Sequence, residues 1–272
     1  MIKKNVCVLV STMYQRDYSI LKKMNISSAA VIINQDDIEK REHFDFKGYP
    51  IKFISKKERG VGKSRNLALS ESTGSISVIA DDDLVYVQNY EEIIIKAFEE
   101  FPDADMIVFE VPSINDQRED KAITKRAQVR WYNSFRYPAY KMAVRTESVK
   151  KNNLQFSLEY GGGARYSHGE DSIFITDFLK KGLKVYSYPV KIAEVNHQES
   201  TWFTGHDESF FTNKGALFYE ISTQYYQLLA LQFLARHRSL YKENQFTFTQ
   251  AYKMMMKGAD TRKQDKEGGE NG

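Results

Sequence analysis

Short apolar runs alternate with mixed polar and apolar stretches through the first two thirds of the chain. An apolar run of four to eight residues between turn-forming residues predicts a buried strand. Seven segments fit that pattern: 6–10, 29–33, 51–55, 76–80, 106–111, 185–188 and 191–195. Helices are predicted over 19–24, 63–70, 90–101 and 173–181. Strands that alternate with helices favour βαβ units and a largely parallel sheet.

Several local signals refine these elements. Asn89 is the predicted N-cap of its helix, with Glu92 reaching back in a capping box, and Gly182 is the predicted residue just after the helix over 173–181. The polar segment 114–130 has no clear period and predicts a loop. The segments 140–145 and 160–163 frame a region of antiparallel character.

The C-terminal part is predicted to be helical. Apolar residues from Leu217 to Ala235 recur every three or four positions and predict one amphipathic helix. A second helix is predicted over 249–257, ended by Gly258. The segment 260–272 is charged and rich in glycine, which predicts disorder.

Composition narrows the class of protein. Hydrophobic residues make up 42% of the chain and charged residues 28%, which is typical of a folded soluble protein. A net charge of +3 is too small for a general nucleic-acid binder. The single cysteine, Cys7, lies in a strand and excludes a disulfide within the chain, so we expect a reducing, cytoplasmic environment. The charge-free stretch 221–235 is too short and too polar to span a bilayer.

Three consecutive carboxylates, Asp81, Asp82 and Asp83, directly follow the apolar run that ends at Ala80. Adjacent carboxylates repel one another and resist desolvation. Mg²⁺ and Mn²⁺ prefer carboxylate oxygens, and open α/β sheets bind ligands at the carboxyl ends of their strands. The triplet therefore predicts a metal site for a phosphate-bearing ligand, although aspartate is also common in ordinary turns.

A glycine-rich helix start forms a second cluster. Gly60 and Gly62 precede Lys63 and Arg65, and such glycines allow a ligand to approach the backbone while the cations meet phosphate or sugar. The spacing is not that of a P-loop. Taken alone, the cluster is equally compatible with an ordinary loop and a solvated helix start.

A third cluster joins Gly161-Gly162-Gly163 to His168-Gly169-Glu170-Asp171. Either carboxylate could accept a proton from a substrate hydroxyl, or Asp171 could simply cap the helix that follows. His197 follows the strand over 191–195, and it becomes a credible ligand if the aspartate triplet holds a metal. His206 lies close enough in sequence that the choice between the two histidines stays open.

The order of these clusters resembles that of family 2 glycosyltransferases with the GT-A fold. The resemblance runs from about Val6 to His206, and its most specific parts are 60–66, 74–83 with its Asp-x-Asp, and Gly169-Glu170-Asp171. It implies a Rossmann-like, mostly parallel α/β sheet with helices on both faces and, here, a C-terminal helical extension. It also implies an inverting, metal-dependent transfer of a sugar from a nucleotide-diphosphate donor, expected to be a UDP-sugar, to a saccharide or lipid-linked acceptor, plausible in bacterial surface polysaccharide assembly.

The resemblance also implies a role for individual residues. Asp83 matches the direct ligand of Mn²⁺ or Mg²⁺, Asp81 a metal- or ribose-side residue, and His197 the late metal ligand. Asp171 matches the general base, with Glu170 beside it. The expected donor-binding residues are Thr12, Tyr14, Asn34, Gly62, Lys63, Arg65, Asp81 and Asp82.

The chain departs from the family pattern at two turns. Asn34-Gln35-Asp36-Asp37 replaces the usual Asp-Asp-Gly-Ser, so an amide would read the base, and Ser11 replaces a proline in the first loop. Two alternatives are a sugar nucleotidylyltransferase, which needs a glycine-rich loop that 11–16 lacks, and a catalytically dead nucleotide-sugar-binding protein, which could lack Glu170 and Asp171.

The expected organisation is a catalytic domain over 1–205, a helical extension over 206–259 and a tail over 260–272. Residues 1–111 form the nucleotide-sugar half of the domain and 112–205 the acceptor half. For the acceptor we expect Gly162, Gly163, His168 and Trp131. The C-terminal helices, with Arg236, Arg238 and Lys242, could touch an anionic membrane, pack on the catalytic domain or pair two subunits.

Overall fold

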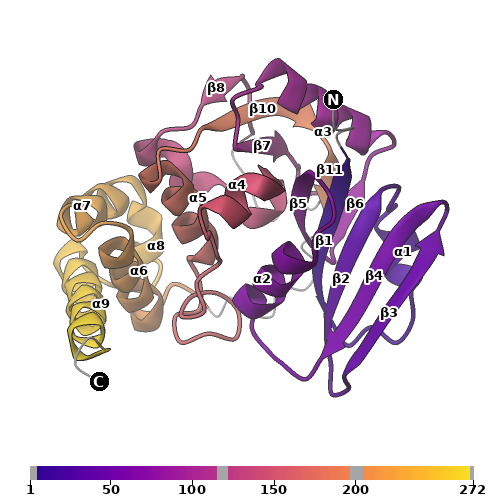
Figure 1. Cartoon of the computed structure of the whole chain (residues 1–272). Coiled ribbons are helices and arrows are strands. Elements are labelled where there is room, and N and C mark those ends of the chain that lie inside the picture. Colours follow the sequence, from indigo (N-terminus) through magenta and orange to yellow (C-terminus); the bar gives the residue numbers. More distant parts are fainter. Residues whose placement is uncertain (1–4, 115–121, 197–204, 270–272) are drawn as a thin grey trace.

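A nine-stranded mixed sheet forms the centre of the molecule in the computed structural model, which describes residues 5–114, 122–196 and 205–269 (Figure 1). The strand order is β3-β4-β2-β1-β5-β9-β7-β10-β8. A separate two-stranded sheet pairs β11 with β6. The strands are β1 (Val6–Met13), β2 (Ala29–Gln35), β3 (Lys40–Phe46), β4 (Tyr49–Lys56), β5 (Ile76–Asp81), β6 (Leu84–Tyr86), β7 (Met106–Glu110), β8 (Ala127–Gln128), β9 (Met142–Arg145), β10 (Val185–Lys191) and β11 (Ala193–Val195).

Strands β4, β2, β1 and β5 run parallel, as the alternation of strands and helices predicted. All the strands predicted from apolar runs are present. β9 runs antiparallel between β5 and β7, in the region where antiparallel pairing was expected. The sequence did not indicate β3, because this edge strand alternates charged and half-buried residues and pairs only with β4.

Helices cover both faces of the sheet. One face packs on α1 (Ser19–Lys23) and α3 (Tyr90–Glu100), and the other on α2 (Val61–Glu71), α4 (Thr146–Lys151) and α5 (Glu170–Lys180). Asn89 precedes α3 in a left-handed conformation and makes no side-chain capping bond, so the predicted capping box is wrong. Short 3₁₀ helices span Trp131–Arg136 and Ala139–Lys141.

A bundle of four helices forms the C-terminal part: α6 (Glu208–Ile221), α7 (Tyr226–Arg236), α8 (Arg238–Lys242) and α9 (Phe248–Gly269). The single helix predicted from Leu217 to Ala235 is broken at 222–225. The bundle packs on the preceding part of the chain through a shared apolar cluster that includes Tyr160, Tyr166 and Ile173. Among the described residues, no helix has the length and apolar character needed to cross a membrane.

Helix α9 continues to Gly269, where the composition predicted disorder from residue 260. Ion pairs to α6 stabilise its last turns, because Arg262 and Lys266 both pair with Glu220, at 2.7 and 2.8 Å. Gly258 does not end the helix. It lies where α9 crosses α6, so close that an added Cβ would overlap the Thr212 carbonyl.

Candidate active site

A large cleft of about 1400 Å³ opens at the carboxyl ends of β1, β2 and β5. Parallel strands present their carboxyl ends at one edge of the sheet, so residues distant in sequence meet there. Most of the predicted site residues line the cleft: Thr12, Tyr14, Arg65, Asp81, Asp82, Asp83, Gly162, Gly163, His168, Glu170 and Asp171.

Arg65 joins the two halves of this cleft. Its guanidinium, almost fully buried on α2, donates from Nη2 to Asp81 Oδ1 at 3.0 Å. Its Nη1 donates to Glu170 Oε1 at 3.0 Å and to Asp171 Oδ1 at 2.9 Å. The three carboxylates keep the pKa of Arg65 above its ordinary value in spite of burial. One cation therefore holds a carboxylate from the end of β5 beside the pair that begins α5.

Burial, followed by the charge of Glu170, raises the pKa of Asp171 to about 7, while Arg65 acts in the opposite direction. A carboxyl group with this pKa can be ionised near neutral pH and still accept a proton effectively. The geometry of Asp171, partly buried and open to the cleft, is suited to general-base chemistry.

The aspartate triplet divides its side chains among different partners. Asp81 contacts Arg65, and Asp82 accepts a hydrogen bond from the Thr12 hydroxyl, which joins the end of β1 to the turn after β5. Burial, and then the charges of Asp81 and Asp82, raise the pKa of Asp83 to about 7. Burial and the neighbouring charges both disfavour the ionised form of Asp83, and a cation bound there would stabilise it.

Within the ranges 5–114, 122–196 and 205–269, no three His, Cys, Asp or Glu side chains are arranged to hold a metal ion. Mg²⁺, however, is commonly held by one or two carboxylates together with substrate phosphates and waters. Asp83 and Asp81 fit that smaller demand, since both line the cleft and the charge of Asp81 contributes to the raised pKa of Asp83. His197 lies outside the described residues, whereas His206 approaches Glu243 at 3.9 Å.

The two glycine clusters contact each other. The Val61 amide donates to the Gly162 carbonyl at 3.0 Å, and a Cβ on Gly163 would lie 3.2 Å from the Gly60 Cα. Gly62 packs against the Ser157 carbonyl, where a Cβ would be only 2.4 Å away. These glycines allow two loops to approach closely, so the helix start supports the cleft wall, and Gly62 does not line the cleft.

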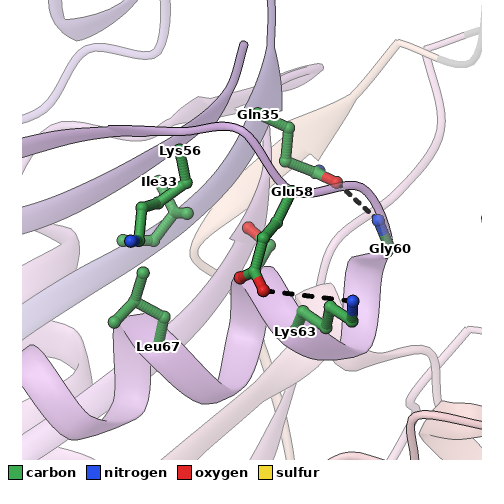
Figure 2. Close-up of a pocket in the computed structure, with 8 residues that line it drawn as sticks. Ile33, Gln35, Lys56, Glu58, Gly60, Lys63 and Leu67 are labelled. Atoms are coloured by element: carbon green, nitrogen blue, oxygen red, sulfur yellow. Dashed lines mark hydrogen bonds and ion pairs between the residues drawn. The ribbon is translucent and has the colours of Figure 1, made fainter. Parts of the chain in front are cut away.

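Lys63 and Asn34 also lie away from the cleft surface. Figure 2 shows Lys63 directed toward Glu58, with their ion pair at 3.9 Å, beside a small separate cavity. Asn34 is fully buried: its Oδ1 accepts from the Gln15 amide at 2.9 Å, and its Nδ2 donates to the Ser55 hydroxyl at 3.1 Å. Asn34 therefore holds neighbouring loops together.

At the end of the cleft beside β1 and β2, the exposed ring of Tyr14 packs with Arg59. The Arg59 Cζ lies 4.9 Å from the ring centroid, and its Nη2 donates to the Tyr14 hydroxyl at 3.0 Å. Gln35 Oε1 accepts from the Gly60 amide at 2.8 Å (Figure 2). Sequence reasoning missed Arg59 and Gln35 as cleft residues, although each directly adjoins a cluster that it identified.

Trp131, a predicted acceptor residue, does not line the cleft. Its ring packs edge-on against Phe135 and Tyr225. Phe135 and Arg136 line the cleft instead. Residues of α6, including Lys214, complete this wall. No motif in the sequence marks Lys214, because a single lysine within an amphipathic helix resembles any solvated position.

Comparison with known proteins supports a common fold. Residues 35–156 match the family model described as Glycosyl transferase family 2. The chain is 16% identical to S. aureus TarS 1-349, with a TM-score of 0.60 over 88% of this chain and 73% of that one. For the same protein in complex with UDP-GlcNAc the values are 18%, 0.61, 88% and 74%. No curated protein sequence matches the chain.

A second solved structure is more distant. The mannosyltransferase PcManGT from Pyrobaculum calidifontis, in complex with GDP-Man and Mn²⁺, is 12% identical, with a TM-score of 0.52 over 97% of this chain and 89% of that one. At such identities the likeness establishes the fold, and the predicted GT-A class with C-terminal helices is confirmed. The residues that match the model described as Glycosyl transferase family 2, 35–156, make up less than half of the chain and lie within this fold.

Proposed function

We propose that the chain transfers a sugar from a UDP-sugar to a hydroxyl group of a saccharide or lipid-linked acceptor, with inversion at the anomeric carbon. The observation that carries the proposal is the Arg65 bridge, which sets the Asp81 carboxylate and the Asp171 carboxylate on facing parts of one cleft. A donor diphosphate beside the aspartate triplet would bring its sugar near Asp171.

The donor base is assigned to the end of the cleft formed by Tyr14, Arg59 and Gln35. An exposed aromatic ring offers a face on which a base can stack, and the fixed arginine restricts where the base can lie. The complex of S. aureus TarS 1-349 with UDP-GlcNAc supports UDP as the nucleotide. Asn34, which is occupied by internal hydrogen bonds, acts on the base only by fixing the Gln15 loop.

Asp171 is assigned as the general base. The acceptor hydroxyl would donate its proton to Asp171 Oδ as its oxygen bonds to the anomeric carbon and the bond to the diphosphate breaks. Arg65 orients Asp171 and favours its ionised form. Glu170, held by the same Nη1 at 3.0 Å, keeps the guanidinium in place.

Asp83 and Asp81 would hold Mn²⁺ or Mg²⁺, with His197 or His206 the candidates for an additional ligand. The ion would supply Lewis-acid neutralisation of the diphosphate leaving group. The complex of PcManGT with GDP-Man and Mn²⁺ supports this choice of metal. The chain's own contribution is the excess of negative charge at the end of β5.

The acceptor is assigned to the wall formed by Gly162, Gly163, His168 and α6. A lipid-linked acceptor would bring the chain to a membrane surface, in keeping with a role in surface polysaccharide assembly. Helix α7 supports this, since Leu228 and Leu231 are exposed on it and the basic residues Arg236, Arg238 and Lys242 lie near its end.

A liposome-pelleting assay tests the membrane contact. The full chain should sediment with vesicles that contain anionic lipids, and a Leu228→Gln, Leu231→Gln variant should sediment less. Equal sedimentation of the two proteins would remove α7 as the contact.

A panel of nucleotide sugars tests the function itself. We expect metal-dependent release of UDP from one UDP-sugar, and no release of GDP from the GDP derivative of the same sugar. The Asp171→Asn variant should be inactive. Release of pyrophosphate from a nucleoside triphosphate and a sugar phosphate would instead indicate a nucleotidylyltransferase. Donor binding without any turnover, with a panel of sugar acceptors supplied, would indicate a binding protein.

A further inference from the structure

A lysine and a histidine line the acceptor wall of the cleft, and each packs against the ring of Phe210. Lys214 lies on α6, and its Nζ lies 5.6 Å from the ring centroids of both Phe210 and Phe233. Its side chain makes no ion pair with any residue in the described ranges, yet it lines the cleft. Burial alone lowers the pKa of Lys214 to about 8. A cation in such a position is costly unless a ligand brings the opposite charge.

His168 lies beside it. Its ring stacks on Phe210 with centroids 5.3 Å apart, and its Nε2 is buried without a hydrogen-bond partner among the described residues. Burial, followed by the charge of Lys214, lowers the pKa of His168 to about 3. The imidazole is therefore neutral near pH 7, with one protonated nitrogen and one bare nitrogen.

A short chain of hydrogen bonds is compatible with the tautomer that carries its proton on Nε2. Asn213 Nδ2 donates to the Ser167 hydroxyl oxygen at 3.1 Å, and that hydroxyl lies 3.2 Å from His168 Nδ1. When Ser167 donates its own proton to Nδ1, the histidine carries its proton on Nε2. In that tautomer His168 Nε2 is a donor with no acceptor among the residues that the structure describes.

Lys214 and His168 Nε2 thus present only donors to the cleft, which suits an anionic oxygen. The position favours the acceptor over the donor. His168 lies three residues before Asp171, and Lys214 lies on α6, whereas the nucleotide end is built from β1, β2 and the loop before α2. Figure 1 shows α6 and β2 on opposite sides of α2 and α5.

We propose that Lys214 and His168 form a subsite for a phosphate or carboxylate group of an acidic acceptor. The inference rests on the proposed transferase function and names the class of its acceptor. Because α6 is fixed against α9 at Gly215, the residue next to Lys214, the subsite is held at a constant distance from the base. An acidic group bound there would set which hydroxyl of the acceptor reaches Asp171.

The test follows the His168 nitrogens by NMR in the full chain, labelled with ¹⁵N-histidine and saturated with UDP and Mg²⁺. Glycerol 1-phosphate and glucuronate are the anionic probes, and glycerol is the uncharged control. A His168→Asn variant assigns the signal. We expect the ¹⁵N chemical shift of His168 Nε2 to be that of a protonated nitrogen. It should change saturably with one of the two anions and should not change with glycerol. The anion that acts distinguishes a phosphate from a carboxylate acceptor.

Lys214→Gln should weaken binding of the active anion by tenfold or more, since hydrogen bonds to charged groups are strong, and Lys214→Arg should retain most of it. Lys96→Gln, which removes an exposed lysine of α3 away from the cleft, should leave it unchanged. UDP affinity should be equal in all four proteins.

Two results would overturn the subsite directly: no chemical-shift change with either anion, or an unchanged affinity of Lys214→Gln for the anion. Displacement of the anion by UDP would also overturn it, because it would assign the pair to the donor diphosphate. Normal UDP binding with no anion response contradicts only the subsite. Failure of the wild-type chain to bind UDP contradicts the proposed function, and the subsite with it.

Discussion

Arg65 donates a hydrogen bond to Asp171 at 2.9 Å across 106 positions of the sequence, from the first turns of α2 to the first turn of α5. The same guanidinium contacts Asp81, so the candidate base and the donor-side aspartate share one buried cation. The relative position of the two carboxylates is thereby fixed by the protein before any substrate enters.

Replacing Arg65 with glutamine should therefore be costly. Three carboxylates would face one another without a counter-ion, and the free energy of unfolding should fall by roughly 3 kcal/mol, as for other pairs broken inside a protein. Urea denaturation measures the loss. Arg41→Gln removes a half-exposed arginine that pairs with Glu71, and it should cost under about 1 kcal/mol. Equal losses in the two variants would contradict the role assigned to Arg65.

The pH dependence of transfer should report the Asp171 carboxyl. A general base acts in its ionised form. The value of kcat/KM should therefore rise with pH through the raised pKa of Asp171, about 7, and then level off. An ordinary exposed aspartate would give a rate already level at pH 6. The Asp171→Asn variant should lose transfer at every pH and still bind UDP. Full activity in that variant, at any pH, would exclude Asp171 as the base.

The crossing of α6 and α9 should not tolerate a side chain at Gly215. A Cβ there would lie 1.8 Å from the Met255 carbonyl oxygen, so Gly215→Ala must push the helices apart. We expect a loss of roughly 1–3 kcal/mol, the usual cost of overpacking. Gly268→Ala is the matched control, since nothing lies within 4 Å of its Cβ position. Thermal unfolding compares the two, and equal stability would refute the close crossing.

The sequence predicted the central sheet because its strands are buried on both faces and appear as apolar runs, such as 6–10 and 29–33. It did not predict β3, whose charged edge-strand pattern carries no such signal. The helical tail beyond Gly258 was also missed, since its stability comes from the pairing of Arg262 with Glu220, a contact across 42 positions.

For the site, the sequence identified the carboxylates but not their common partner. Arg65 was assigned to the nucleotide from the family pattern, and only the packing of α2 against α5 reveals its bridge. The glycines suggested a ligand loop, and the structure adds that Gly60 and Gly163 bring two loops into close contact. Local patterns report local conformation, and these roles depend on contacts over about a hundred residues.

The most direct test of the account is calorimetric titration of UDP into the chain with Mn²⁺ and with a chelator, for the wild type and for Asp83→Asn. The account predicts UDP binding that Mn²⁺ strengthens at least tenfold in the wild type, and loss of that gain in Asp83→Asn. Asp45→Asn, at an exposed position near the end of β3, should behave as the wild type. Absence of UDP binding with Mn²⁺ present, or an undiminished effect of Mn²⁺ in Asp83→Asn, would contradict it.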